Sequence, residues 1–454
     1  MPDAPAANLI GALTHNPGAP SQAPATNSQA PASAAAAPPA GPTLTIAQAE
    51  QMALKNNPNI SVARLLALAQ GQVTREVQSI ELPQATSDLE AVDAHHDSRI
   101  TGGGAPLAGG SNMTSSRILD KAAAGLTVTQ LITDFGHTHN LVQSARSNAR
   151  AQLESEHATE LDITLTVDQA FYQALTAQAV LRVAQETVNQ RQATDDQVGA
   201  LTKSKIRSDL DLSFADVQLS QAKLLLLDAQ NSAQSAMASL NTVLGSEQDQ
   251  QYTLVDETNG NPPPAPDDGE ALVQTAFKQR PDLASLNDKY LSAKQYTTAE
   301  RDLWMPTLSA IGMGGGAPVR DDLIESSWYL AAGANLSIPV FNGFLYSADE
   351  KEAKYRAQAA QEGVRNLRDT IARDVRIAVL NAQSAYQRIA VTQQLLNQAN
   401  FAFDLASARY KIGLSGIVEI SEAQLNQTQA EIANTNARYS YQTALAVVRY
   451  EIGQ

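Results

Sequence analysis

The chain has 454 residues and no cysteine, which excludes disulfide bonds, thiol nucleophiles and cysteine-based zinc sites. Its formal net charge of -15 argues against binding of nucleic acid through bulk electrostatics. No run of residues approaches the roughly 18 apolar residues of a membrane helix, so a soluble protein and a β-barrel membrane protein both remain open.

Residues 1–42 are rich in Pro and Ala and contain neither Lys nor Arg nor an apolar stretch. This composition does not fit a signal peptide, and we expect a disordered leader or linker. The rest of the chain divides into two structural repeats, which we place at residues 43–260 and 261–454.

Paired prolines give the first evidence of the repeat. Pro58 matches Pro281 and Pro83 matches Pro306, and the two pairs share the same sequence offset. Proline is tolerated in the first turn of a helix, whereas a later proline ends the helix. Each half is therefore predicted to contain a helix of about 23 residues between its prolines, and Asn57 is a suitable N-cap in the first half.

An apolar pattern repeats at a second, somewhat shorter offset and predicts coiled-coil helices. Apolar residues alternate by steps of four and three, which is the spacing of a coiled-coil seam. A helix from about residue 137 to 200 would be roughly 90–100 Å long. A turn and a return helix follow in each half. The seam positions are Ile163, Val167, Ala170, Ala174, Ala177, Leu181, Ala184 and Val188, then Ile371, Val375, Ala378, Ala382, Ala385, Ile389, Thr392, Leu396, Ala399, Phe403, Ala406 and Tyr410.

Strand patterns lie between the helices. Residues 328–340 alternate apolar with small or polar side chains, and residues 118–128 do so more weakly. Alternation fits a strand with one lipid face and one water face, or a half-buried sheet in a soluble α+β protein. The partner strands, near 84–95 and 306–314, are poorly patterned.

Two glycine-rich segments, 102–106 and 312–318, are interpreted as loops because neither has the features of a phosphate-binding loop. Each half thus has two strands, which makes four per chain. Four strands cannot close a barrel and would leave bare edges in lipid, whereas three copies of the chain would supply 12 strands.

Three segments resemble the TolC-like outer membrane efflux protein family. They are an opening helix, LTIAQAEQMALKNNPNI, a strand-to-helix junction, LSIPVFNGF, and a long C-terminal hairpin that begins ARYKIGLSG. The first half departs from the family pattern. Leu131 stands where the second half has Pro339, and the first hairpin turn lacks the Tyr and Gly of the second. We therefore expect the two hairpin tips not to be equivalent.

The resemblance implies a mixed α/β membrane protein with long antiparallel α-helical coiled-coil hairpins and four β-strands per chain. In this fold a homotrimer forms a 12-stranded β-barrel in outer-membrane lipid and an α-helical tunnel in the periplasm. The implied function is the outer-membrane exit duct of a tripartite efflux or type I secretion system. The implied partners are a periplasmic adaptor (membrane fusion) protein and an inner-membrane pump of RND or ABC type.

A soluble coiled-coil scaffolding protein is the alternative, but it does not account for strand pairs at matching points of both halves. We find no catalytic arrangement, so we expect no enzyme, no cofactor and no nucleic-acid partner. The pairs His95-His96 and His137-x-His139 lack acidic or cysteine partners at ligand spacing, and we expect no metal site.

The second hairpin tip resembles the family's adaptor-docking motif, although glycine is also simply permissive in a tight turn. Its docking residues would be Ile412, Gly413, Leu414 and Ser415. The first tip carries a basic cluster that could pair with nearby acidic groups, contact an adaptor, or lie in solvent. That cluster consists of Lys203, Lys205 and Arg207.

Glu419 and Glu422 follow the second tip and share one helix face at i, i+3 spacing. They match family positions where acidic residues ring the closed periplasmic entrance. Asp211 is the repeat equivalent of Glu419, and Asp209 lies close to it. These four residues are the predicted gate, and the alternative is a solvated acidic helix face.

Overall fold

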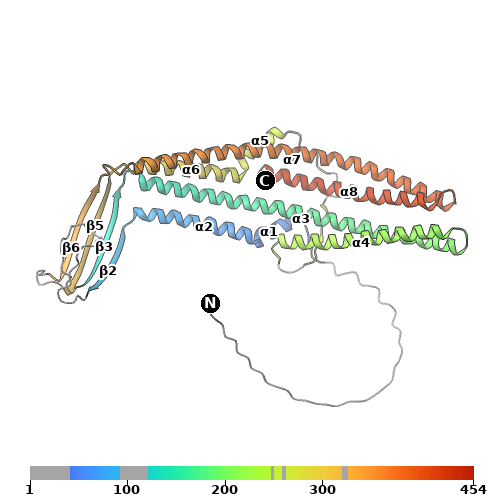
Figure 1. Ribbon diagram of the computed structural model, residues 1–454, viewed down its shortest axis with the longest axis horizontal. Coiled ribbons are helices and arrows are strands. Elements are labelled where there is room, and N and C mark those ends of the chain that lie inside the picture. Colours follow the sequence, from blue (N-terminus) through green and yellow to red (C-terminus); the bar gives the residue numbers. More distant parts are fainter. Residues whose placement is uncertain (1–40, 93–120, 247–249, 258–261, 320–325) are drawn as a thin grey trace, which may run out of the picture.

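The computed structural model describes residues 41–92, 121–246, 250–257, 262–319 and 326–454. These residues form an elongated helical bundle with a curved four-stranded sheet at one end (Figure 1). The loop predicted at 102–106 and nearly all of the predicted leader lie outside the described residues.

The elements follow the same order in both halves. The first half contains β1 (Thr43–Leu44), α1 (Ile46–Asn56), α2 (Pro58–Gln78), a short 3-10 helix η1 (Ser79–Glu81), β2 (Gln84–Val92), β3 (Lys121–Thr133), α3 (His137–Lys203) and α4 (Asp209–Val243). The second half contains β4 (Thr253–Leu254), α5 (Gly269–Gln279), α6 (Pro281–Asp302), β5 (Thr307–Val319), β6 (Trp328–Ser337), α7 (Leu345–Lys411) and α8 (Ile417–Glu451).

The two sequence offsets are also the offsets of the helices. Helices α1 and α2 recur as α5 and α6 at the offset of the paired prolines, and α3 and α4 recur as α7 and α8 at the shorter offset of the apolar pattern. Both prolines begin their helices, and the Asn57 side chain accepts a hydrogen bond from the backbone N–H of Asn59, as an N-cap should. The proline and capping predictions are confirmed.

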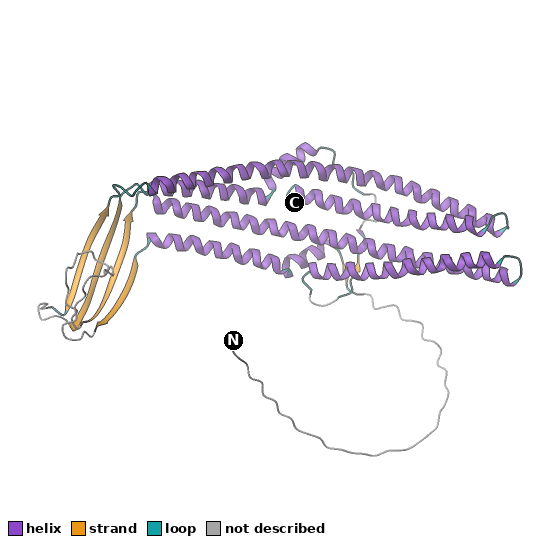
Figure 2. Ribbon diagram, in the orientation of Figure 1, coloured by secondary structure: helices purple, strands orange, loops and turns teal. Residues whose placement is uncertain are grey.

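Helices α3 and α7 have 67 residues each, about 100 Å at 1.5 Å per residue, and run the whole length of the bundle (Figure 2). Every predicted seam residue is buried or half-buried. Many of them are alanines, which let the helices approach closely. Among the helices of the described ranges, none is long and apolar enough to cross a membrane.

Helix α4 ends where α2 begins, so the two lie end to end along α3 (Figure 1). Asn57 Nδ2 donates a hydrogen bond of 3.0 Å to the carbonyl of Val243 at this joint. Gly245 follows with a φ of +72°, and a Cβ there would overlap the backbone of Asn56. Gly453 repeats this geometry with a φ of +83°, which explains why both halves close with glycine.

The prediction of four strands was incomplete. The described residues also contain β1 and β4, two-residue strands that pair in parallel and join the two halves at mid-bundle. Strands this short carry no alternating pattern, so the sequence offered no signal for them.

The large sheet is antiparallel in the order β2-β3-β5-β6. Directly paired residues of neighbouring strands point to the same side of the sheet. The register therefore divides the side chains of all four strands between two faces. One face is apolar and carries Leu89, Leu126, Leu330 and Leu336. The opposite face carries mainly polar and small residues, among them Thr86, Thr127, Ser309 and Asn335.

The interpretation of residues 312–318 as a loop was wrong, since these residues belong to β5. One of their glycines, Gly315, packs under an aromatic side chain. Tyr329, on the polar face, places its hydroxyl where a Cβ on Gly125 or Gly315 would lie. A tyrosine that covers glycines of neighbouring strands compensates for their missing side chains, which explains the glycines at these two positions.

Replacing Gly315 by valine is expected to destabilise the sheet by about 1–3 kcal/mol, because the added atoms would overlap Tyr329 and the β3 backbone. Gly312→Val is the matched control, since nothing lies within 4 Å of a Cβ at that position. Thermal unfolding in detergent, followed by circular dichroism, measures both variants. Equal melting temperatures for the two would contradict the packing argument.

Candidate functional site

The two hairpin tips lie together at the end of the bundle farthest from the sheet (Figure 1). In the second tip, Gly413 has a φ of +79°. In the first tip, Lys205 occupies the equivalent position and has a φ of +56°. The two backbones therefore turn in the same way, and the expectation of non-equivalent tips holds only for the side chains.

Arg207 and Tyr410 connect the two tips. The Arg207 guanidinium lies 4.7 Å from the centre of the Tyr410 ring, and its Nη2 donates to the Ser415 carbonyl at 3.5 Å. Tyr410 is buried in a small apolar cluster with Val198, Ala215, Ile417 and Ile420. Of the predicted basic cluster, Arg207 thus binds an aromatic ring and a carbonyl, while Lys203 and Lys205 are exposed.

The predicted docking residues divide into two groups. Ile412 and Leu414 are 70% and 68% exposed, which is unusual for large apolar side chains and leaves them free to meet a partner. Gly413 provides the turn between them. Ser415 instead faces inward and is buried.

Three of the predicted gate residues, Asp209, Asp211 and Glu419, lie in the first turns of α4 and α8, and Glu422 lies in the second turn of α8. Glu419 Oε1 is 3.5 Å from Arg409 Nε of the same hairpin, and Glu422 is exposed. Asp211 forms a reciprocal capping box with Ser208, in which the Asp211 N–H donates to Ser208 Oγ at 3.2 Å and Asp211 Oδ2 accepts from the Ser208 N–H at 3.3 Å. Asp209 is exposed. Asp211 therefore also stabilises the start of α4.

Arg191 is a buried cation that the sequence analysis did not identify. It lies between α3 and α8, where its Nη1 donates to Gln424 Oε1 at 2.5 Å and its Nη2 donates to the Ser421 carbonyl at 3.3 Å. Burial lowers the pKa of Arg191 to about 10, so the group stays charged at neutral pH. These contacts fix the segment of α8 that carries Glu422.

A signal for Arg191 was present in the pattern of apolar residues. Continuing the seam of α3 beyond Val188 by steps of three and four reaches Arg191, whose repeat equivalent in α7 is the buried Ala399. A charged residue at a seam position needs a buried partner.

The histidine pairs show no sign of metal coordination in the described part of the chain. His137 Nδ1 lies 2.9 Å from the carbonyl of Ala299, and His139 is exposed. His95-His96 lies outside the described residues. Over the described ranges, no group of three or more His, Cys, Asp or Glu residues could hold a metal ion.

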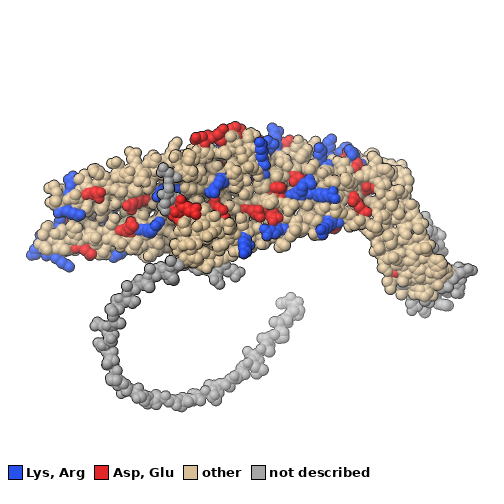
Figure 3. All heavy atoms as spheres, turned by 180° about the vertical axis from the view of Figure 1, so that it is seen from behind, with Lys and Arg blue, Asp and Glu red and all other residues tan. Residues whose placement is uncertain are grey.

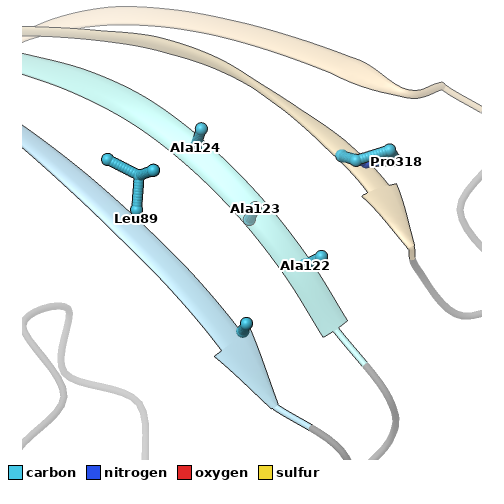
Figure 4. Close-up of a pocket in the computed structure, with 6 residues that line it drawn as sticks. Leu89, Ala122, Ala123, Ala124 and Pro318 are labelled. Atoms are coloured by element: carbon cyan, nitrogen blue, oxygen red, sulfur yellow. The ribbon is translucent and has the colours of Figure 1, made fainter.

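Charge is distributed unevenly between the two ends of the molecule. Acidic and basic side chains are mixed over the helices, while the visible face of the sheet is almost free of them (Figure 3). Towards the end of the sheet farthest from the helices lies an apolar depression of about 280 Å³, whose lining includes Leu89 of β2, Ala122 and Ala124 of β3 and Pro318 of β5 (Figure 4).

Known proteins resemble the chain over most of its length. It is 25% identical over 338 residues to the pyoverdine export outer membrane protein OpmQ of Pseudomonas aeruginosa, covering 72% of this chain and 69% of OpmQ. It is 25% identical over 364 residues to the outer membrane protein TolC of Vibrio cholerae, covering 76% of this chain and 81% of TolC.

Solved structures show the same fold. A crystal structure of CusC, described by its conformational changes on folding and transmembrane channel formation, superposes with a TM-score of 0.76 at 20% identity, covering 90% of this chain and 92% of CusC. The family model described as outer membrane efflux protein matches residues 49–246 and 272–454. Since that match includes both repeats, the chain belongs to the outer membrane efflux protein family.

Proposed function

We propose that this outer-membrane efflux protein works as a homotrimer whose sheets close into one 12-stranded barrel and whose helices form a periplasmic tunnel. The observation that carries the proposal is the pair of unpaired sheet edges. Strands β2 and β6 are the outer strands of the sheet, and each has one neighbour only among the described strands. An open edge in lipid leaves backbone groups unsatisfied, and pairing β6 of one copy with β2 of the next satisfies them.

The apolar face of the sheet supports contact with lipid. Leu89 is 83% exposed, Leu330 78% and Trp328 69%. Exposed aromatic residues also gather where the sheet meets the helices, as in the aromatic girdles of membrane barrels. These are Phe135, Trp304, Phe341 and Phe344.

Exposed apolar side chains on the helices support assembly with further copies of the chain. Helix α2 exposes Leu65 and Leu68, α4 exposes Leu224 and Leu227, and α7 exposes Leu380 together with other large apolar residues. Monomeric proteins rarely leave so many apolar residues in water, and neighbouring protomers would cover them.

The hairpin tips would carry the remaining partners. In this proposal Ile412 and Leu414 dock onto a periplasmic adaptor protein, which couples the duct to an inner-membrane pump of RND or ABC type. Glu419 and Glu422, with Asp209 and Asp211 beside them, form an acidic constriction at the entrance. The duct is a passive conduit, and the pump supplies the energy.

Light scattering of the protein in detergent tests the assembly. We expect a protein mass of three times 48.2 kDa and discrete, cation-preferring conductance in planar bilayers. A monomer that never inserts into bilayers would overturn the proposal. Adding a proline within β6, for example Ala332→Pro, removes a backbone donor and should abolish insertion while the helical circular dichroism remains.

A further inference from the structure

Helix α1 meets the long helices at a pair of carboxyl groups, one buried and one half-buried. Asp168 of α3 is only 4% exposed. Its Oδ2 lies 3.5 Å from Arg449 Nη2 of α8, and its Oδ1 has no hydrogen-bond partner among the described residues. Glu50 of α1, which is half-buried, shares a side-chain hydrogen bond with Asp168.

Two carboxyl groups form a hydrogen bond with each other only when they hold a proton between them. Arg449 and Tyr172 of α3 also face Asp168. The charge of Glu257 acts on Tyr172. Burial, together with the hydrogen bond and charge of Glu50, raises the pKa of Asp168 to about 7, and Arg449 opposes this shift. One positive group therefore faces two acidic groups, of which Asp168 is nearly inaccessible to water.

The same joint in the second half has a different chemistry. Arg376 of α7 is the repeat equivalent of Asp168, and its Nη2 donates to Glu270 Oε2 of α5 at 2.8 Å. Both side chains are more than half exposed. The second half therefore has an exposed pair of opposite charges where the first half has a buried carboxyl group.

We propose that the joint of α1, α3 and α8 is a proton-dependent clamp, which holds α1 when Asp168 carries a proton that it donates to Glu50, and loosens when Asp168 ionises. The corresponding joint of α5 and α7 has an exposed arginine in place of the buried Asp168, so it should not show this dependence. This clamp is a property of one chain, so it goes beyond the proposed channel and does not depend on it.

The direction of the pH dependence follows from the raised pKa of Asp168. When α1 detaches, Asp168 titrates near its ordinary value of 3.8, whereas in the closed joint its pKa is about 7. The closed joint therefore binds the proton more tightly. Its stability is greatest at low pH, falls as the pH rises from about 4 to 7, and changes little above that range.

Detachment of α1 would also disturb the apolar core in the middle of the bundle. On the apolar side of α1, Ala49 and Ala53 are fully buried in the same cluster as Leu44 and Leu254 of the parallel strand pair. The end of α1 also contacts Gly245, at the joint where α4 meets α2. Detachment of α1 would thus free the strand pair that connects the two halves.

Hydrogen–deuterium exchange of the purified full-length protein in detergent tests the clamp. Exchange of α1 amides, residues 46–56, should accelerate by tenfold to a hundredfold between pH 5 and pH 8 after correction for intrinsic rates. Exchange of α5 amides, residues 269–279, is the internal control and should show no such change.

Asp168→Asn keeps the shape of the side chain but cannot ionise, and it should make α1 exchange independent of pH. Glu50→Gln removes the charge that faces Asp168 and should weaken the pH dependence, and it serves if the first variant folds poorly. Asp162→Asn is the matched control, because Asp162 also joins α3 to α8 through Tyr450, at 2.6 Å, and should leave the pH dependence intact. Equal acceleration in α1 and α5, or pH dependence that stays undiminished in both Asp168→Asn and Glu50→Gln, would overturn the proposal.

Discussion

Replacing Arg280 by methionine is expected to cost about 2–4 kcal/mol of stability, because it leaves the half-buried carboxylate of Glu451 without its partner. The Arg280 side chain is 11% exposed and forms ion pairs with Asp282 and Glu451. Its Nη1 also donates to the Glu451 carbonyl at 3.3 Å. Burial by itself would lower the pKa of Arg280, but the hydrogen bond and charge of Asp282 and the charge of Glu451 raise it.

Arg280 connects the end of the return helix α8 to the start of α6 in the second half, as Asn57 connects the end of α4 to the start of α2 in the first half. Both residues precede the proline that begins a helix, and both donate to the last carbonyl of the return helix, Val243 or Glu451. Loss of Arg280 therefore removes the joint between α8 and α6 as well as a charge pair.

The matched control is Arg376→Met, which removes an ion pair of similar length from an exposed site. Exposed pairs contribute about 0–1 kcal/mol, so its melting temperature in detergent should remain near that of the unchanged protein. Glu451→Gln added to Arg280→Met should recover part of the loss, because it removes the unpaired charge. Equal melting temperatures for the two single variants would show that the Arg280 contacts are not stabilising.

The helices could be predicted from the sequence because their signals are local and occur in both halves. Prolines mark where α2 and α6 begin, and the steps of four and three mark the buried side of α3 and α7 over many turns. The repeat doubled this evidence, since each half could be compared with the other. The strand β5 was harder to recognise, because glycines occupy three of the positions on its apolar face, Gly312, Gly314 and Gly316.

The site was less predictable because its contacts join residues far apart in the chain. Arg191 and Gln424 are 233 residues apart, and Asp168 meets α1, a helix from the other end of its repeat. No local pattern indicates that Glu50 and Asp168 lie together. The acidic residues after the tips were found only because they match a family motif, and their role at an entrance remains a prediction.

Replacing both Glu419 and Glu422 by alanine is expected to give a leakier channel. In a trimer the two positions would bring six carboxylates near one axis, where they would bind cations and repel one another. The Glu419 carboxylate also contacts Arg409, so its loss should loosen the start of α8. We expect larger single-channel conductance in planar bilayers and at least a tenfold weaker block by multivalent cations.

Glu352→Ala with Glu362→Ala is the control, because it removes the same charge from exposed positions of α7 that lie far from the tip. This variant should keep the conductance and the cation block of the unchanged protein, which would show that net charge alone does not set either property. If the Glu419 and Glu422 variant keeps both properties as well, the acidic residues lie on a solvated helix face and the gate must be sought elsewhere. Arg191, which holds the same part of α8 against α3, would then be the next residue to replace.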